Sequence, residues 1–262
     1  MDLGMNGNIA VITGASAGIG LAVAHGLAAE GCDLLLCARD SQRLEQAAEA
    51  VRQRHGVRVV AVPADVGTRS DVDRVVEAIS RNYGGADILI NNAGTGSEET
   101  ILDASDERWQ HYWDLHVMAA VRLSRALAPM MRERGGGVIL NNASICATQP
   151  LGHEPIYNVT KAALVMFSKC LANELIPFGI RVNALNAGLV RTQSWEDAAK
   201  RQTGDAGWES WLDTIAREQA PIGRFASPEE IADFMVFLCS ARASYCVGSS
   251  YYVDGGWLNV VT

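Results

Sequence analysis

Short apolar segments rich in β-branched residues alternate along the chain with longer segments of helical periodicity. The apolar segments are NIAVITG (8–14), CDLLLCA (32–38), VRVVAVP (57–63), ADILINNAG (86–94), GVILNNAS (137–144), IRVNALNAG (180–188) and SSYYVDGG (249–256). Their hydrophobicity is continuous rather than alternating, which is typical of strands buried on both faces of a parallel sheet. The alternation predicts an α/β fold with a doubly wound parallel sheet and helices on both faces.

The segment SQRLEQAAEAVRQRHG (41–56) indicates how the helices begin and end. Ser41 is a candidate N-cap and Gly56 a typical stop. No repeat, low-complexity tract or linker interrupts the pattern. We therefore predict a single domain over residues 1–262, with an insertion at about 191–222 that forms a substrate-binding flap.

Two of the predicted helices, at about 111–131 and 155–177, are apolar on nearly all sides. Such a helix must be covered on more than one face. The sheet covers one face, and a second subunit is the natural cover for the other, so we expect a homo-oligomer, either a dimer or a homotetramer. The alternative is that loops of the same chain cover it.

The composition narrows the class of protein. Apolar residues make up 48% and charged residues 20%, as in ordinary globular proteins, and the formal charge of −8 argues against a nucleic-acid partner. No apolar run approaches the ~18 residues that span a membrane, and the start of the chain lacks the basic segment of a secretory signal. The six cysteines form no C-x-x-C pair, which favours buried reduced thiols over a disulfide or metal site. We expect a cytoplasmic protein without nucleic-acid, membrane or metal partners.

The stretch TGASAGIG follows the first strand and opens a helix, with glycines at Gly14, Gly18 and Gly20. Such a loop lets backbone N–H groups approach a pyrophosphate at the positive end of the helix. Tight turns also use glycine for conformational reasons alone, so the position after a first strand is what favours a dinucleotide site. The spacing is G-x-x-x-G-x-G rather than G-x-G-x-x-G.

The second strand ends in CARD, which places Arg39 at the corner where the adenosine ribose is read. An arginine there suits the 2′-phosphate of NADP, whereas an acid suits the 2′-hydroxyl of NAD. Asp40 follows one residue later and is expected to belong to the turn into the next helix. We predict NADP as the preferred cofactor, with NAD as the alternative if Asp40 reaches the ribose.

Four motifs, in order, resemble the short-chain dehydrogenase/reductase family: TGASAGIG, NNAG (91–94), Ser144 followed by YNVTK (157–161), and the terminal VDGG. The resemblance extends from about residue 7 to residue 257. It implies a Rossmann-type fold and an NAD(P)-dependent oxidoreductase that interconverts a ketone and a secondary alcohol. Within the family, the pattern is most similar to that of 3-oxoacyl-thioester reductases of fatty-acid or polyketide metabolism. The alternative of another class is a catalytically silent nucleotide-binding regulatory protein.

The chemistry of the family explains the spacing of Tyr157 and Lys161, which share one face of a helix as i and i+4. A free tyrosine has a pKa near ~10, and a nearby ammonium lowers it toward the working range of a general acid/base. By resemblance, Ser144 hydrogen-bonds the substrate oxygen, Tyr157 exchanges the proton and Lys161 also binds the nicotinamide ribose. The cofactor supplies the hydride.

The resemblance also implies which residues contact the cofactor. They are Gly14, Ser16, Gly18, Ile19, Gly20, Arg39, Asp65, Val66, Asn91, Ala93, Gly94, Tyr157, Lys161, Gly188, Val190 and Thr192. Asp65 and Val66 are expected to flank the adenine, and the last three to hold the carboxamide.

The chain departs from the family pattern at two places. His116 stands where the family usually has an asparagine that holds a proton-relay water. A histidine also has a donor and an acceptor, so His116 either replaces the relay with its own pH dependence or is a neutral change. We count it as a catalytic candidate. In NAG (186–188) the family usually has P-G, and losing proline predicts a looser turn beside the nicotinamide.

The predicted flap carries Trp195, Trp208 and Trp211. Aromatic side chains in a flap suggest an apolar, ring-bearing substrate, although they can equally pack the flap onto the domain. Gln149 and His153, between the serine and the tyrosine, are also expected near the pocket.

Overall fold

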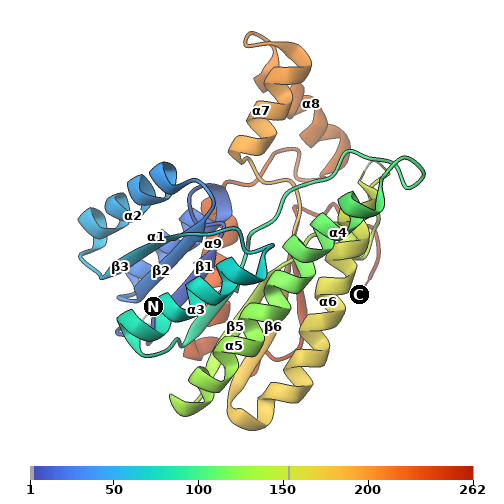
Figure 1. The fold of residues 1–262 in the computed structure, drawn as a ribbon. Helices are drawn as coiled ribbons and strands as arrows, with labels where there is room; N and C mark the ends of the chain where they lie inside the picture. Colours follow the sequence, from blue (N-terminus) through green and yellow to red (C-terminus); the bar gives the residue numbers. More distant parts are fainter. Residues whose placement is uncertain (1–2, 153, 262) are drawn as a thin grey trace.

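A computed structural model describes residues 3–152 and 154–261, and its centre is a seven-stranded sheet (Figure 1). The strands are β1 (Ile9–Thr13), β2 (Asp33–Ala38), β3 (Val59–Pro63), β4 (Ile88–Asn91), β5 (Gly137–Asn142), β6 (Ile180–Ala187) and β7 (Ser250–Val253). Their order is β3-β2-β1-β4-β5-β6-β7, and all neighbours are parallel. The order reverses between β1 and β4, where doubly wound sheets bind their ligands. All seven predicted strands are confirmed.

Helices cover both faces of the sheet (Figure 1). On one face lie α1 (Gly18–Ala29), α2 (Ser41–His55) and α9 (Pro228–Cys239); on the other lie α3 (Arg69–Tyr83), α5 (Ala119–Glu133) and α6 (Pro155–Leu175). Neighbouring residues of one strand supply opposite layers: Ile12 packs toward α1, and Val11 toward α3 and α5. This double burial is why the strands are continuously apolar in sequence.

The helix α2 ends as predicted but begins one residue earlier than predicted. Gly56 adopts the left-handed conformation, with φ of +71°, directly after the last helical residue. The N-cap is Asp40, whose carboxylate accepts the N–H of Arg43 at 2.9 Å, and Ser41 is the first helical residue. The prediction of Ser41 as the cap was therefore wrong, because the carboxylate one position earlier takes that bond.

The predicted helix at 111–131 consists of three consecutive pieces. They are α4 (Asp106–Trp113), a π-helical turn η1 (Asp114–Met118) and α5. A π turn carries one more residue per hydrogen-bonded loop than an α turn, and such turns are frequent at functional sites. His116 lies at its centre.

The predicted flap forms two helices, α7 (Gln193–Thr203) and α8 (Trp208–Gln219), which project from one end of the molecule in Figure 1. The short helices η2 (Ile145–Ala147), η3 (Ile176–Phe178) and η4 (Ala241–Ala243) complete the fold. Within the described residues all six cysteines are free thiols, four of them buried and Cys170 exposed. No helix in the described part of the chain is long and apolar enough to cross a membrane.

Candidate active site

Connected cavities open where the carboxyl ends of β1, β4, β5 and β6 meet. The main cavity, of about 400 Å³, is lined by twelve of the predicted site residues: Gly14, Ser16, Gly18, Ile19, Ala93, Gly94, Ser144, Tyr157, Lys161, Gly188, Val190 and Thr192. A second one, of about 250 Å³, shares Gly14 and Ser16 with it and is lined by Arg39, Asp65 and Val66. Gly20, Asn91 and His116 are buried and line neither of these cavities.

The glycine loop leaves the start of α1 open to an anion. Gly14 and Gly18 have φ of +65° and +54°, which favour glycine. A side chain at Gly20 would overlap the carbonyl of Gly14, so this glycine allows α1 to pack tightly beneath the loop. Among the described residues, no side chain caps α1 and no acid lies in its first turn. Its first N–H groups are therefore available to a phosphate.

The two asparagines of NNAG, Asn91 and Asn92, point in different directions. The sequence analysis selected Asn91 as the cofactor contact, and this is the one whose side chain faces the core. Asn91 is buried and its Nδ2 donates to Asn141 Oδ1 at 2.7 Å, so its side chain faces the core and does not line the cavity. Asn92 lines the main cavity, and its Nδ2 donates to the carbonyl of Thr13 at 3.0 Å. Side chains of consecutive strand residues point to opposite sides, and this parity could have identified Asn92 from the sequence.

The second cavity, where the adenosine end of the cofactor is predicted to lie, is lined by two arginines, Arg39 and Arg43. Both side chains are exposed at the cavity rim. The carboxylate of Asp40 caps α2, as predicted for a residue of the turn rather than a ribose ligand. Arg43 was not identified from the sequence, because only the helical turn after Asp40 brings it back to the cavity.

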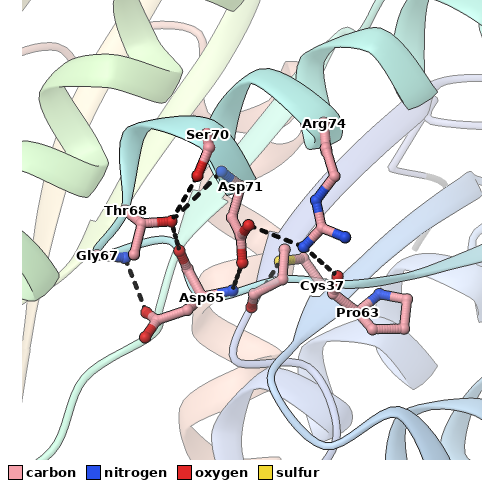
Figure 2. A network of polar contacts seen from close by, with 9 residues as sticks. Cys37, Pro63, Asp65, Gly67, Thr68, Ser70, Asp71 and Arg74 are labelled. Carbon is pink, nitrogen blue, oxygen red and sulfur yellow. Dashed lines mark hydrogen bonds and ion pairs between the residues drawn. The ribbon is translucent and has the colours of Figure 1, made fainter.

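A polar network fixes the loop that carries Asp65 and Val66 (Figure 2). The Asp65 carboxylate accepts the N–H of Gly67 at 3.0 Å, and the Asp65 N–H donates to Asp71 Oδ2 at 2.7 Å. Arg74 pairs with Asp71 at 2.8 Å and also donates to the carbonyl of Pro63 at 3.1 Å. The network joins the end of β3 to the start of α3, so it holds this side of the second cavity in place.

Ser144, Tyr157 and Lys161 meet in the main cavity. Ser144 follows β5, and its Oγ accepts the N–H of Cys146 at 3.3 Å. Lys161 is 3% exposed; its Nζ donates to the carbonyl of Asn142 at 2.7 Å and lies 5.3 Å from the centre of the Tyr157 ring. The three groups expected to carry proton transfer are therefore close together.

Burial, rather than the lysine, controls the protonation of these groups. Burial raises the pKa of Tyr157 above its ordinary value, and only the hydrogen bond from Ser144 opposes this. Burial also lowers the pKa of Lys161 from 10.5 to about 8. The expectation that the ammonium depresses the tyrosine pKa is therefore wrong, because loss of water around the phenol is the larger effect.

His116 is 2% exposed and fully hydrogen-bonded. Its Nε2 accepts the N–H of Thr95 at 3.2 Å, which leaves Nδ1 as the donor to Thr160 Oγ1 at 2.8 Å. The ring meets Tyr157 edge-on, with 5.4 Å between ring centres. Burial, followed by the charge of Lys161, lowers the pKa of His116 to about 2. The geometry supports a neutral ring that positions its neighbours.

The turn beside the predicted nicotinamide site is held firmly without proline. β6 continues to Ala187, and the N–H of Gly188 donates to the carbonyl of Val253 at 3.1 Å. A Cβ at Gly188 would lie 2.7 Å from the Cα of Asp254. The expected loosening is therefore absent from the described turn, because β6 and β7 hold it from both sides.

A cavity of about 510 Å³ lies beneath the flap and shares Ser144 and Tyr157 with the main one. Trp195 and Trp211 line it. Trp208 instead packs beneath the cations of Arg191 and Lys200, 5.1 and 5.0 Å from the ring centre. Polar groups also line this cavity, namely Ser97, Glu98, Glu154, Ser194 and Arg201. His153 lies outside the described residues.

Comparisons with known proteins agree with this arrangement. The profile of the family described as Enoyl-(Acyl carrier protein) reductase matches residues 14–258. The solved structure of L-sorbose reductase from Gluconobacter frateurii, complexed with NADPH and L-sorbose, is 59% identical with a TM-score of 0.98 and 100% of both chains covered. Dehydrogenase/reductase SDR family member 4 from Oryctolagus cuniculus is 35% identical over 95% of this chain and 92% of its own. Galactitol 2-dehydrogenase from Agrobacterium fabrum is 33% identical over 97% of this chain and 99% of its own.

The chain therefore belongs to the short-chain dehydrogenase/reductase family. The resemblance read from its motifs is confirmed, and so is the Rossmann-type fold.

Replacing Lys161 with methionine is expected to stabilise the cofactor-free protein by about 1–3 kcal/mol at pH 7. The folded state binds the Lys161 proton less tightly than the unfolded chain, because burial lowers the pKa from 10.5 to about 8. The lost bond to Asn142 offsets part of the gain. The buried ammonium lowers the free energy of unfolding by its full amount below pH 8, and this effect fades as the pH rises to 10.5. The difference in stability between wild type and Lys161→Met should therefore narrow over that range. Urea denaturation at pH 7 and 9.5 measures it, and a variant less stable than wild type at pH 7 contradicts the expectation.

Replacing His116 with asparagine should leave the pH dependence of kcat/KM unchanged between pH 5 and 8, because the ring is already neutral there. The amide retains a donor and an acceptor, so we expect a loss of about tenfold or less. The measurement is the pH–rate profile of both proteins. An apparent pKa that is present in wild type and absent in the variant would show that the ring titrates during catalysis.

Proposed function

We propose that this protein is an NADPH-dependent reductase of a small polyhydroxy ketone, which it converts to the corresponding polyol. The observation that carries the proposal is the likeness over the whole chain to L-sorbose reductase, whose structure contains NADPH and L-sorbose. The relative named galactitol 2-dehydrogenase supports the same substrate class. Family membership supports the wider activity, the interconversion of a ketone and a secondary alcohol.

The cavities fit a phosphorylated dinucleotide. The uncapped start of α1 offers N–H groups to the pyrophosphate, and Arg39 with Arg43 would hold the 2′-phosphate. Asp40 also lines this cavity, but one oxygen of its carboxylate already accepts the N–H of Arg43 as the cap of α2. Gly188, Val190 and Thr192 would surround the nicotinamide end. When bound, NADPH supplies the hydride that adds to the carbonyl carbon.

The side chains would handle the proton. The raised pKa of Tyr157 keeps its phenol protonated at neutral pH, which is the form that donates to a carbonyl oxygen during reduction. Ser144 shares both cavities with Tyr157 and would hydrogen-bond the same oxygen. The ammonium of Lys161 would stabilise the phenolate that remains after proton transfer. His116 and Thr160 would fix the helical turn that holds Tyr157, since Thr160 Oγ1 donates to the Tyr157 carbonyl at 3.1 Å.

The substrate cavity combines the tryptophans with polar groups, which suits a molecule that has both C–H faces and hydroxyl groups. Glu154 reaches so close to Gly96 that a Cβ there would overlap its carboxylate. Glu154 and Arg201 together place an acceptor and a donor on the cavity wall, which suits several hydroxyl groups. The faces of Trp195 and Trp211 can pack against the C–H groups of a carbohydrate chain.

The test measures NADPH oxidation by the purified protein with L-sorbose and with an acetoacetyl thioester. We expect faster turnover of L-sorbose, and slower turnover of L-sorbose when NADH replaces NADPH. Tyr157→Phe should lower kcat by about 10²–10⁴-fold, because the proton donor is lost.

Tyr245→Phe serves as a control for the assay, since it makes the same change at an exposed tyrosine that lines neither the cofactor cavity nor the substrate cavity. Faster thioester turnover would assign the protein to 3-oxoacyl-thioester reduction instead. NADPH binding without turnover of any carbonyl would support the regulatory alternative.

The oligomeric state belongs to the same proposal: we infer a cytoplasmic homotetramer. Val159 and Met166, on α6, are 47% and 64% exposed and lie seven residues apart on one helix face. Ile176 and Trp113 are also exposed, at 43% and 37%. A second copy of the chain would remove this apolar surface from water.

Light scattering at micromolar concentration should give about four times the 28.1 kDa of one chain. Met166→Glu should shift the mass toward smaller species, because it places a charge in the contact. Leu102→Glu, at an exposed apolar residue in the loop before α4, is the comparison. A wild-type mass of one chain would refute the assembly.

A further inference from the structure

The chain after β7 returns across the mouth of the substrate cavity. Asp254 organises its turn, since its carboxylate accepts the N–H of Gly256 at 3.1 Å and that of Leu258 at 2.8 Å. Gly255 has φ of +64°, and its carbonyl accepts the N–H of Ile222 at 3.1 Å. The turn is therefore attached to the point where the flap rejoins the domain.

A second attachment joins this segment to the loop after Ser144. The side-chain Oε1 of Gln149 accepts the backbone N–H of Asn259 at 3.0 Å. The neighbouring Thr148 shares a hydrogen bond of 2.7 Å with the hydroxyl of Tyr252 on β7. Gln149 was expected near the substrate pocket; its side chain bonds the C-terminal segment, residues 254–261, which borders that pocket through Trp257.

Trp257 lies between these two attachments. Its ring is partly buried and lines the substrate cavity together with Trp195 of the flap. It packs against the apolar cluster formed by Leu189, Trp195 and Phe225 with α8 residues Ile215 and Ala216. The C-terminal segment thus supplies a wall of the cavity, and this wall packs against α8 of the flap.

We propose that Gln149 is a positioning residue for substrate binding: its bond to Asn259 holds the C-terminal segment so that Trp257 closes the substrate cavity. This inference rests on the proposed function, in that the cavity binds the ketone. Among the described residues, none of the segment 254–261 lines the cofactor cavity. Loosening the segment therefore weakens ketone binding and leaves both cofactor binding and the proton donor unchanged.

The experiment compares variants in steady-state kinetics with L-sorbose and NADPH. Gln149→Leu removes the acceptor and Asn259→Pro removes the N–H, so each should raise the KM for L-sorbose five- to tenfold. The kcat should stay within twofold, and the Kd for NADPH should not change. Asn259→Ala keeps the N–H and is the matched control, expected to behave as wild type. Gln149→Glu keeps an acceptor oxygen and should restore most of the affinity.

An unchanged KM in both Gln149→Leu and Asn259→Pro overturns the proposal, and so does an equal rise in Asn259→Ala. Amide hydrogen exchange supplies a readout that needs no turnover. Gln149→Leu should speed exchange at least tenfold in peptides covering residues 255–261 and α8, relative to wild type and Asn259→Ala. If wild type does not reduce L-sorbose, the proposed function fails while exchange still decides the inference; unchanged exchange overturns it.

Discussion

The side-chain amide of Asn92 joins three strand ends at the point where the cofactor cleft begins. Its Nδ2 donates to the carbonyls of Thr13 and Gly14 after β1, and its Oδ1 accepts from Asn142 Nδ2 at the end of β5. The carbonyl of the same Asn142 accepts Lys161 Nζ. One connected set of hydrogen bonds therefore relates the glycine loop, the cleft wall and the lysine. The amide thus adds side-chain bonds to the backbone pairing of β1, β4 and β5 at the end where the cleft opens.

Three titratable side chains of the site are buried, and burial makes the charged form of each one unfavourable. An ammonium, a phenol and an imidazole lie in one poorly hydrated region, where charge is penalised for each of them. The protein resolves this by keeping His116 and Tyr157 neutral, so Lys161 is the only one of the three charged at neutral pH. A buried cation without a carboxylate partner among its described contacts is unfavourable for folding and well suited to an anionic ligand or a developing phenolate.

The fold could be predicted because local patterns determine it. Double burial makes each strand continuously apolar, and Gly56 ends a helix through its own backbone conformation. The clustering of Ser144, Tyr157 and Lys161 followed from motifs in a known order. The details that the sequence analysis did not predict depend on the position of single side chains. Asp40 takes the cap from Ser41 by a shift of one residue.

Contacts between residues far apart in the chain could not be predicted from the sequence. The bond between Gln149 and Asn259 spans 110 residues, and no local pattern marks either partner. The prediction that Lys161 lowers the pKa of Tyr157 failed for a related reason. Its proximity to Lys161 was readable from i, i+4 spacing, but the exclusion of water was not, because several distant segments enclose the ring.

The π turn at Asp114–Met118 has a consequence for how this helix tolerates change in length. Each residue turns an α-helix by about 100°, so one additional residue offsets the faces of α4 and α5 by roughly that angle. With the offset, His116 meets Tyr157 while Leu123 and Leu127 still pack into the sheet. A deletion of one residue here would convert the π turn into regular α-helix. Either the contact of His116 with Tyr157 or the packing of Leu123 and Leu127 would then be lost, because both could no longer face their partners. Insertions and deletions are therefore constrained in this helix far more than substitutions of similar size.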